Sequence, residues 1–249
     1  MTRRSLDEVQ AAVEGVEGWL STDQIVRLYS AAAATRDGDQ IVEIGSFRGR
    51  STIVLASASP DGVEVVTIDP HAGTDRGPQE YAGYEAEAQS DHDAFIANLA
   101  RAEVAPKVRH VREFSDRAHP AVEGPISVLF IDGAHRFRPA RSDIDEWGAR
   151  VREGGTMLIH DAFSSVGVTL AILRELAAGP RFRYVGRSRS LAEFRADLDG
   201  SLPARVANTA RLLAQLPWFT KNVTLKMLLT VNLGGLLERI TGRRPEWPY

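Results

Sequence analysis

The sequence predicts an α/β protein built on a Rossmann-like, doubly wound and mostly parallel sheet. Short apolar segments typical of buried strands alternate with helical segments along most of the chain. A glycine-bounded turn follows the first of these strands, and acidic residues follow several of the others. We expect the sheet domain to span residues 38–196, between an N-terminal helical segment at 1–37 and a helical C-terminal appendage at 197–249.

The expected elements follow one another in the order of such a sheet. A helix is predicted over residues 5–35, where Ser5 and Glu8 have the spacing of a capping box. Strands are predicted at 41–44, 63–68, 108–111, 126–131 and 156–159. Helices are predicted at 51–57, 91–102, 139–151 and 166–178, and a final strand pair at 182–186 and 190–194.

Composition excludes several classes of site. The chain has 249 residues and a net charge of −3, with 43% hydrophobic and 25% charged residues, which is typical of a soluble globular protein. The absence of cysteine excludes disulfides, thiolate metal sites and cysteine nucleophiles. Neither a signal peptide nor an uncharged stretch of about 18 residues is evident. We therefore expect a cytoplasmic protein without stable membrane insertion.

The C-terminal part differs from the rest in charge. Residues 201–249 contain seven Lys or Arg and two Glu, together with many apolar side chains. A packed appendage or a dimer surface is the favoured interpretation, and a homodimer is expected. A basic amphipathic helix lying on a membrane surface is the alternative.

The turn after the first strand has features of a ligand-binding loop. Gly45 and Gly49 allow a sharp turn and a close approach of the backbone to a ligand. The third glycine of a G-x-G-x-x-G motif is missing, which argues against a dinucleotide, although an NAD(P)-dependent oxidoreductase stays a rival hypothesis. Glu43 before the turn suits a cationic ligand, and Asp69 lies where an acidic residue would bind a ribose diol.

The run E-I-G-S-F-R-G-R-S-T, followed later by I-D-P, resembles the donor motif of class I S-adenosylmethionine-dependent methyltransferases. It is most similar to the variant found in metal-assisted O-methyltransferases of sugars and antibiotics, over about residues 38–195. The resemblance implies that S-adenosyl-L-methionine is the cofactor. The residues it implies for the donor site are Glu43, Gly45, Phe47, Gly49 and Ser51 around the methionine part, Asp69 on the ribose, Ser115 and Asp116 near the adenine, and Asp132 beside them.

A metal site is predicted at the ends of two neighbouring strands. Asp132 follows the strand at 126–131, and His160 and Asp161 follow the strand at 156–159. Adjacent strands lie about 4.8 Å apart, so these side chains can converge on one ion. Two carboxylates and one imidazole suit Mg²⁺ or Mn²⁺. The related enzymes usually have an acidic pair at the second position, so His160 is either a ligand, a supporting donor or a packed histidine.

Transfer of a methyl group to a hydroxyl needs a base. A sugar hydroxyl is a poor acid at neutral pH, and a metal ion lowers the pKa of a hydroxyl bound to it. His135 is the predicted base, because it shares a loop with Asp132 and imidazole titrates near neutrality. Asp132 is the second candidate, and Asp143 is a candidate support for His135.

The acceptor is expected to be a small molecule or an oligosaccharide, bound through the polar segment 70–93. Arg76, Tyr81 and Tyr84 are the candidate substrate-binding residues, and partial disorder is expected there without ligand. Catechols, polyketides and other natural-product hydroxyls are alternative acceptors, and a non-catalytic binding module is an alternative function. No nucleic acid is expected, because the predicted catalytic domain is acidic.

Overall fold

The computed structural model describes residues 3–72 and 85–230, and it contains a seven-stranded sheet in the order β3-β2-β1-β4-β5-β7-β6. Strands β1 to β5 pair in parallel, whereas β7 runs antiparallel to both β5 and β6. This confirms the predicted α/β fold with a mostly parallel sheet. The strands are β1 (Gln40–Ile44), β2 (Glu64–Ile68), β3 (Val108–Val111), β4 (Ile126–Ile131), β5 (Val151–Ile159), β6 (Arg183–Ser188) and β7 (Leu191–Arg195).

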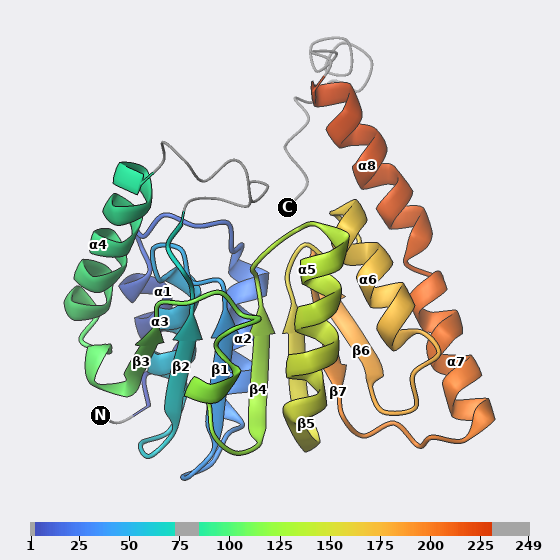
Figure 1. The fold of residues 1–249 in the computed structure, drawn as a ribbon, viewed down its shortest axis with the longest axis horizontal. Helices are drawn as coiled ribbons and strands as arrows, with labels where there is room; N and C mark the ends of the chain where they lie inside the picture. The colour runs from blue at the N-terminus through green and yellow to red at the C-terminus, as the bar shows by residue number, and fades with distance from the viewer. Residues whose placement is uncertain (1–2, 73–84, 231–249) are drawn as a thin grey trace.

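Helices cover both faces of this sheet (Figure 1). Strand side chains alternate between the faces, so Ile41 and Val128 enter one core whereas Val42 and Leu129 enter the other. The first core is closed by α1 (Leu6–Ala12), α2 (Thr22–Ala33), α3 (Arg50–Ala58) and α4 (Glu85–Arg101). The second is closed by α5 (Phe137–Ser142), α6 (Val166–Leu176), α7 (Leu202–Leu213) and α8 (Leu216–Thr230).

The N-terminal part forms two helices, so the prediction of one helix over 5–35 was wrong. The capping box at Ser5 is present and starts α1. The chain then leaves helical geometry, with φ of 73° at Gly15 and 155° at Gly18. A second capping box, formed by Ser21 and Gln24, starts α2. The break between the two helices brings residues 17–20 to the functional site described below.

Two other predicted boundaries differ from the structure. The helix predicted over 139–151 is a short α5, followed by a π-helical turn at Asp143–Trp147 and a 3₁₀ turn at Gly148–Arg150, and β5 starts at Val151. Helix α4 starts at Glu85, so the last part of the loop predicted over 70–93 is helical. Further 3₁₀ turns lie at Ala105–Lys107 and His119–Ala121. Arg76, Tyr81 and Tyr84 lie outside the described residues.

Parallel pairing aligns the ends of the central strands. Ile44 at the end of β1 is paired with Ile68 of β2 and with Ile131 of β4, and Ile131 is paired with Ile159 of β5. The residues that follow these strands therefore meet at one edge of the sheet, which is the ligand-binding edge of open α/β sheets. Among the described helices, none has the length and apolar character that crossing a bilayer requires.

Candidate active site

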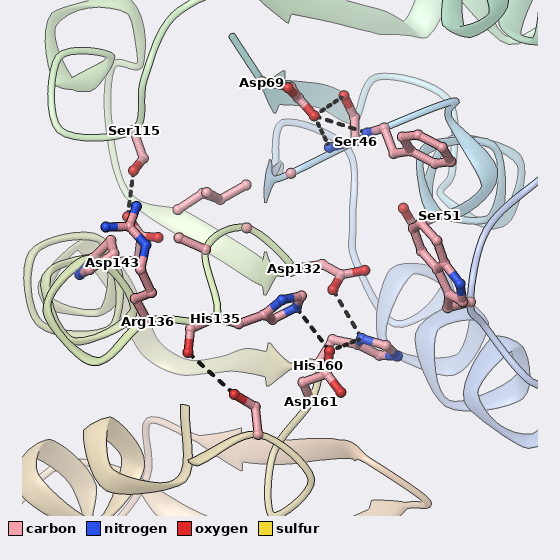
Figure 2. Close-up of a pocket in the computed structure, with 18 of the residues that line it drawn as sticks. Ser46, Ser51, Asp69, Ser115, Asp132, His135, Arg136, Asp143, His160 and Asp161 are labelled. Carbon is pink, nitrogen blue, oxygen red and sulfur yellow. Dashed lines mark hydrogen bonds and ion pairs between the residues drawn. The ribbon is translucent and has the colours of Figure 1, made fainter. Parts of the chain in front are cut away.

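A cavity of about 1410 Å³ lies at this edge of the sheet. Its walls come from the turns that follow β1, β2, β4 and β5, from the break between α1 and α2, and from α8. Figure 2 shows the polar side chains that point into it from these turns. The predicted site residues that line the cavity are Gly45, Phe47, Ser51, Asp69, Ser115, Asp132, His135, His160 and Asp161.

The turn after β1 is clamped by a carboxylate from the next strand. Asp69 Oδ2 accepts hydrogen bonds from the backbone N–H groups of Ser46 (2.8 Å) and Phe47 (2.9 Å). Asp69 Oδ1 accepts a third from the N–H of His71 at 2.7 Å. Phe47 and His71 both adopt positive φ, at 46° and 45°, and these bonds offset the cost of that backbone conformation. The structure therefore places Asp69 in the cavity wall and also makes it the support of the glycine turn.

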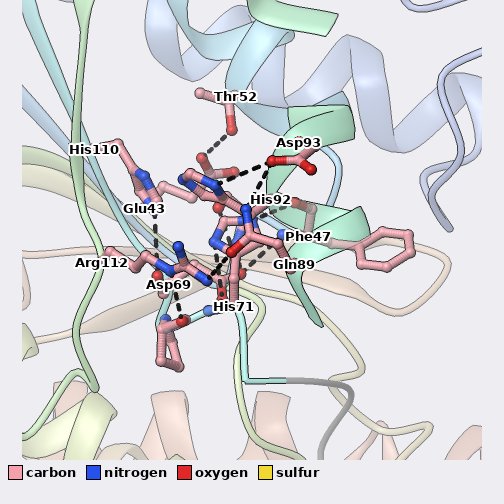
Figure 3. Close-up of polar contacts among 12 residues, drawn as sticks. Glu43, Phe47, Thr52, Asp69, His71, Gln89, His92, Asp93, His110 and Arg112 are labelled. Carbon is pink, nitrogen blue, oxygen red and sulfur yellow. Dashed lines mark hydrogen bonds and ion pairs between the residues drawn. The ribbon is translucent and has the colours of Figure 1, made fainter. Parts of the chain in front are cut away.

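Three imidazoles pack behind this clamp (Figure 3). His71 Nε2 lies 2.8 Å from the Phe47 carbonyl, and the rings of His71, His92 and His110 are 5.0 to 5.3 Å apart between centroids. His110 Nε2 lies 3.2 Å from the Asp69 carbonyl. Burial, reinforced by the neighbouring His71, lowers the pKa of His110 to about 4. His110 therefore supports the clamp as a neutral imidazole.

Glu43 is completely buried beneath the turn and does not line the cavity. Its carboxylate accepts hydrogen bonds from the Ser51 hydroxyl and, at 2.5 Å, from the Thr52 hydroxyl at the start of α3. Burial raises the pKa of Glu43 to about 7. Gly49, at φ 86°, caps α3 and faces Phe95 instead of the cavity. Both residues thus shape the turn from behind, whereas direct contact with a donor was the expectation.

The region predicted to lie near the adenine contains a buried carboxyl group. Ser115 donates a hydrogen bond to Asp143 Oδ1 at 2.6 Å, and Trp147 Nε1 donates to the Ser115 carbonyl at 3.2 Å. Burial raises the pKa of Asp143 to about 7. Asp143 thus pairs with Ser115, whereas the sequence made it a candidate support for His135. Ser115 and Asp116 both line the cavity.

The metal-ligating side chains that converge in the described part of the chain are Asp132, His135 and Asp161, whose candidate ligand atoms all lie within 4.8 Å of one another. His135 Nε2 lies 2.9 Å from Asp161 Oδ2, and the His135 side chain is 48% exposed. Burial by itself raises the pKa of Asp161, but His135 and His160 outweigh it and hold this pKa well below its usual range. Asp161 is therefore anionic, and it lines the cavity together with Asp132 and His135.

His160 belongs to the base of this cluster. The side chain is 3% exposed, with Nδ1 at 2.9 Å from Asp132 Oδ1 and at 3.6 Å from Asp161 Oδ2. Burial opposes its protonation, but the two carboxylates outweigh burial and raise the pKa of His160 to about 10. The backbone at Asp161 is left-handed, with a φ of 52°, so the chain leaves the direction of β5 there. His135 is thus a further side chain within reach of a shared ion, beside His160, which the sequence predicted and whose Nδ1 lies close to both carboxylates.

Two parts of the cavity wall were not predicted from the sequence. Trp19, from the break between α1 and α2, stacks on Phe47 at 5.1 Å between ring centroids and is 47% exposed. Helix α8 contributes Val223, Lys226, Met227 and Thr230. The pair Gly15 and Gly18 could have indicated the helix break. The spacing of 223, 226, 227 and 230 is that of one helical face, but no sequence signal assigns this face to the cavity.

This strand order, with a single reversed strand at β7, is that of the Rossmann-like sheet in methyltransferases that use S-adenosylmethionine. Residues 42–162, which span β1 to the end of β5, match a family model described as a methyltransferase domain. Residues 42–162 therefore form a methyltransferase domain, and the sheet has the Rossmann-like fold of class I methyltransferases.

Solved structures share this fold at low sequence identity. Cofactor-bound Rv0187 from MTB is 20% identical with a TM-score of 0.54, covering 78% of this chain and 90% of that one. An O-methyltransferase from Bacillus cereus in complex with SAH is 20% identical with a TM-score of 0.51, covering 76% and 88%. The O-methyltransferase NovP is 16% identical with a TM-score of 0.55, covering 71% and 81%.

Proposed function

We propose that this methyltransferase transfers the methyl group of S-adenosylmethionine to an oxygen, and that a divalent ion, Mg²⁺ or Mn²⁺, assists the transfer to a sugar hydroxyl. The observation that carries the proposal is the convergence of Asp132, His135 and Asp161 on the cavity beside the donor turn. The names of the structural neighbours from Bacillus cereus and of NovP, both O-methyltransferases, support the choice of oxygen as the acceptor atom.

The side chains present fit a hard divalent cation. Asp132 and Asp161 offer carboxylate oxygens, which Mg²⁺ and Mn²⁺ prefer, and the cavity leaves room for substrate oxygens and water. Asp161 stays ionised because its pKa lies well below the usual range. A bound ion would lower the pKa of a hydroxyl group that it contacts.

The protein residues then have separate tasks. The turn around Gly45 and Phe47 holds the donor, and Asp132 and Asp161 orient the acceptor hydroxyl in line with it. The acceptor oxygen forms a bond to the methyl carbon as the carbon–sulfur bond breaks, and the hydroxyl proton passes to His135. His135 suits this task because Asp161 contacts its ring and because the side chain lines the cavity with nearly half of its surface exposed.

The acceptor we propose is a short mannoside that is already O-methylated, with its 1-hydroxyl as the methylated group. This choice follows from the likeness of the whole sequence, including the basic apolar tail, to the methylmannose polysaccharide 1-O-methyltransferase. Arg76, Tyr81 and Tyr84 are proposed to contact the sugar. Catechols, other natural-product hydroxyls and RNA belong in the assay as competing acceptors. A homodimer is part of the same proposal.

The decisive experiment measures transfer of radiolabelled methyl groups to a panel of methylated mannosides, other sugars, catechols and RNA, with Mg²⁺ and then with a chelator. We expect label in a sugar, lost with chelator and restored by Mg²⁺. Asp132→Asn and Asp161→Asn should each reduce transfer by about 1,000-fold, whereas Asp145→Asn, on an exposed position of the π-helical turn, should not. Transfer that ignores the chelator would contradict the metal, and transfer only to RNA would contradict the acceptor.

A second measurement distinguishes the two roles considered for His135, which are general base and metal ligand. If His135 is the base, His135→Gln lowers kcat and leaves the Mg²⁺ concentration for half-maximal activity unchanged. If His135 is instead a ligand, that concentration rises together with the loss of rate. Asp161→Asn provides the reference for a lost ligand in the same titration.

A further inference from the structure

Helix α8 leans over the cavity with one of its faces. Four residues of α8 line the cavity. Lys226, Met227 and Thr230 lie three, four and seven residues after Val223. This is the spacing of a single face of an α-helix. Figure 1 shows α8 rising beside α6 at the end of the sheet where the strands of the parallel set terminate. The appendage predicted as a packed or dimer-forming tail is thus part of the site wall.

Two hydrogen bonds tie this face to the loop that carries Asp161. Asn222, which is 3% exposed, donates to the Phe163 carbonyl at 3.2 Å. Lys226 Nζ donates to the Ser164 hydroxyl at 2.9 Å. Because Phe163 and Ser164 follow Asp161 by two and three residues, the helix face has a defined position relative to the cluster of Asp132, His135 and Asp161.

The chemistry of the face is mixed. Lys226 and Thr230 are polar, whereas Val223 and Met227 are apolar, and the Met227 side chain is 64% exposed although it lines the cavity. Burial lowers the pKa of Lys226, and the nearby charge of Asp161 opposes that shift. An ammonium group carries three N–H donors, so contact with Ser164 is compatible with contact to a ligand oxygen. Such a wall suits a ring that has both C–H surface and oxygen substituents.

We propose that this face of α8 binds the methyl acceptor, and that Lys226 selects acceptors with a second oxygen next to the hydroxyl that is methylated. The inference rests on the proposed O-methyl transfer and adds the residue that distinguishes among its acceptors. Val223 and Met227 cover the apolar surface of the acceptor ring. Lys226 donates a hydrogen bond to the neighbouring oxygen, and Thr230 provides a further polar contact at the outer end of the face.

The test uses a matched pair of acceptors: a sugar that the wild-type protein methylates, and its deoxy analogue without the neighbouring hydroxyl. Lys226→Met keeps side-chain length and removes the donor. We expect it to lower kcat/KM about 10-fold or more for the full sugar and less than about 2-fold for the analogue, since a hydrogen-bonding site discriminates most against the partner that leaves its groups unpaired. Lys226→Arg, which keeps a cationic donor, should restore most of the preference.

The controls separate selection from folding and from donor binding. Lys221→Met changes an exposed lysine on the same helix and should behave as wild type. Calorimetry with S-adenosylhomocysteine should give the same Kd for all variants, and thermal unfolding should give similar midpoints. If Lys226→Met does not fold, Thr230→Val and Lys226→Arg carry the test, because the first should weaken the preference for the full sugar and the second should keep it.

Each outcome has a distinct meaning. Equal losses with both acceptors, or no loss with either, would overturn the role of Lys226 while O-methyl transfer by the wild-type protein still stands. Transfer by the wild-type protein to no oxygen acceptor would overturn the proposed function and this inference together. Preference for the full sugar that persists in Lys226→Met but changes when Mn²⁺ replaces Mg²⁺ would assign selection to the metal cluster instead of α8.

Discussion

The two halves of the cavity are built in different ways. The half that we propose binds the donor is local in sequence: residues 43–71 supply the turn, the carboxylates beneath it and the imidazole behind it. The acceptor half is assembled from distant segments, namely the helix break near Trp19, the turns after β4 and β5, and α8 near the end of the described chain. Because the residues of the first half are close in sequence, this half is rigid and a sequence motif predicts it. Remote construction lets the second half change without disturbing the sheet.

Electrostatics separate the halves as well. In the donor half, Asp69 and Glu43 direct their oxygens at protein N–H and O–H groups, so these oxygens hold the turn. In the acceptor half, Asp132 and Asp161 face one another across imidazoles at the cavity wall, and carboxylates so placed invite a cation. Changes in the donor half should therefore affect donor affinity, and changes in the acceptor half should affect acceptor use. Three substitutions test this division, and a fourth tests the histidine cluster that supports the donor half.

The largest effect is expected for Gly45→Ala. Gly45 has a φ of 85°, and an added Cβ would lie 2.3 Å from the Asp132 carbonyl oxygen. The β1 and β4 ends would have to separate, so we expect donor affinity to fall about 100-fold. Calorimetry with S-adenosylhomocysteine measures this loss. Gly124→Ala is the matched control, because Gly124 has a similar φ of 73° with open space around it. It should cost only about 1–2 kcal/mol of unfolding free energy and no donor affinity.

If Gly124→Ala and Gly45→Ala weakened donor binding equally, the close approach of the two strands would not be what shapes the turn. If Gly45→Ala instead spared the donor and impaired only the acceptor, the division between the halves would be wrong, because the effect would then reach the acceptor through Asp132, which the added Cβ would contact.

Asp69→Asn should have the next largest effect. The carboxylate of Asp69 accepts hydrogen bonds from the N–H groups of Ser46, Phe47 and His71. An asparagine amide has only one acceptor oxygen, so its N–H₂ would face one of these donors. Loss of the bond from the His71 N–H, together with the donor–donor contact that replaces it, at about 1 kcal/mol each, predicts a donor Kd raised about 30-fold. The KM for the acceptor should change little. Asp93→Asn, at a side chain that is 70% exposed, is the control for removing one negative charge.

A third prediction concerns the imidazoles behind the clamp. The pKa of His110 falls from 6.5 to about 4 in the folded protein, so the unfolded chain binds more protons as pH falls below 6.5. This group therefore contributes stability above pH 6.5 that is lost progressively between pH 6.5 and 4. His110→Phe should reduce the difference in unfolding free energy between pH 7 and pH 5 by about 2 kcal/mol, measured by urea titration at each pH.

The comparison with wild type is needed because other groups act in the opposite direction. The raised pKa values of Glu43 and Asp143, both about 7, give stability that is present at low pH and lost as pH rises through that value. Both groups remain in the variant, so only the difference between proteins reports on His110. His92→Phe should act in the same direction as His110→Phe, since burial lowers the pKa of His92 too. An unchanged pH dependence in both variants would contradict the role of burial.

The donor half is also the part that the sequence predicts well. The strands predicted at 41–44 and 63–68 are present with limits within one residue, and the glycine turn and Asp69 lie together at the cavity. The reason is that a strand followed by a turn depends on residues close in sequence. Even there, the pattern does not distinguish a carboxylate that faces the ligand from one that faces the protein, as the buried position of Glu43 illustrates.

The acceptor half depends on features with no local signal. His160 and His135 are both plausible ligands in the sequence, but the left-handed backbone at Asp161 turns its carboxylate toward His135 and leaves His160 beneath the cluster. The placement of Lys226 depends on packing across more than 60 residues of chain, through its contact with Ser164. Such contacts arise from tertiary structure, and a single sequence carries no direct record of them.

The smallest effect is expected for Trp19, and it decides to which half the helix break belongs. Trp19 stacks on Phe47, a donor-turn residue, yet nearly half of its surface is exposed. Because Asp69 already holds the Phe47 backbone, we expect Trp19→Ala to leave the donor Kd within about 2-fold and to raise the acceptor KM about 5-fold, the value of one aromatic contact. Trp19→Phe should retain most of this contact. If the donor Kd rose as much as the acceptor KM, Trp19 would instead be part of the donor site. The break between α1 and α2 would then belong to the donor half.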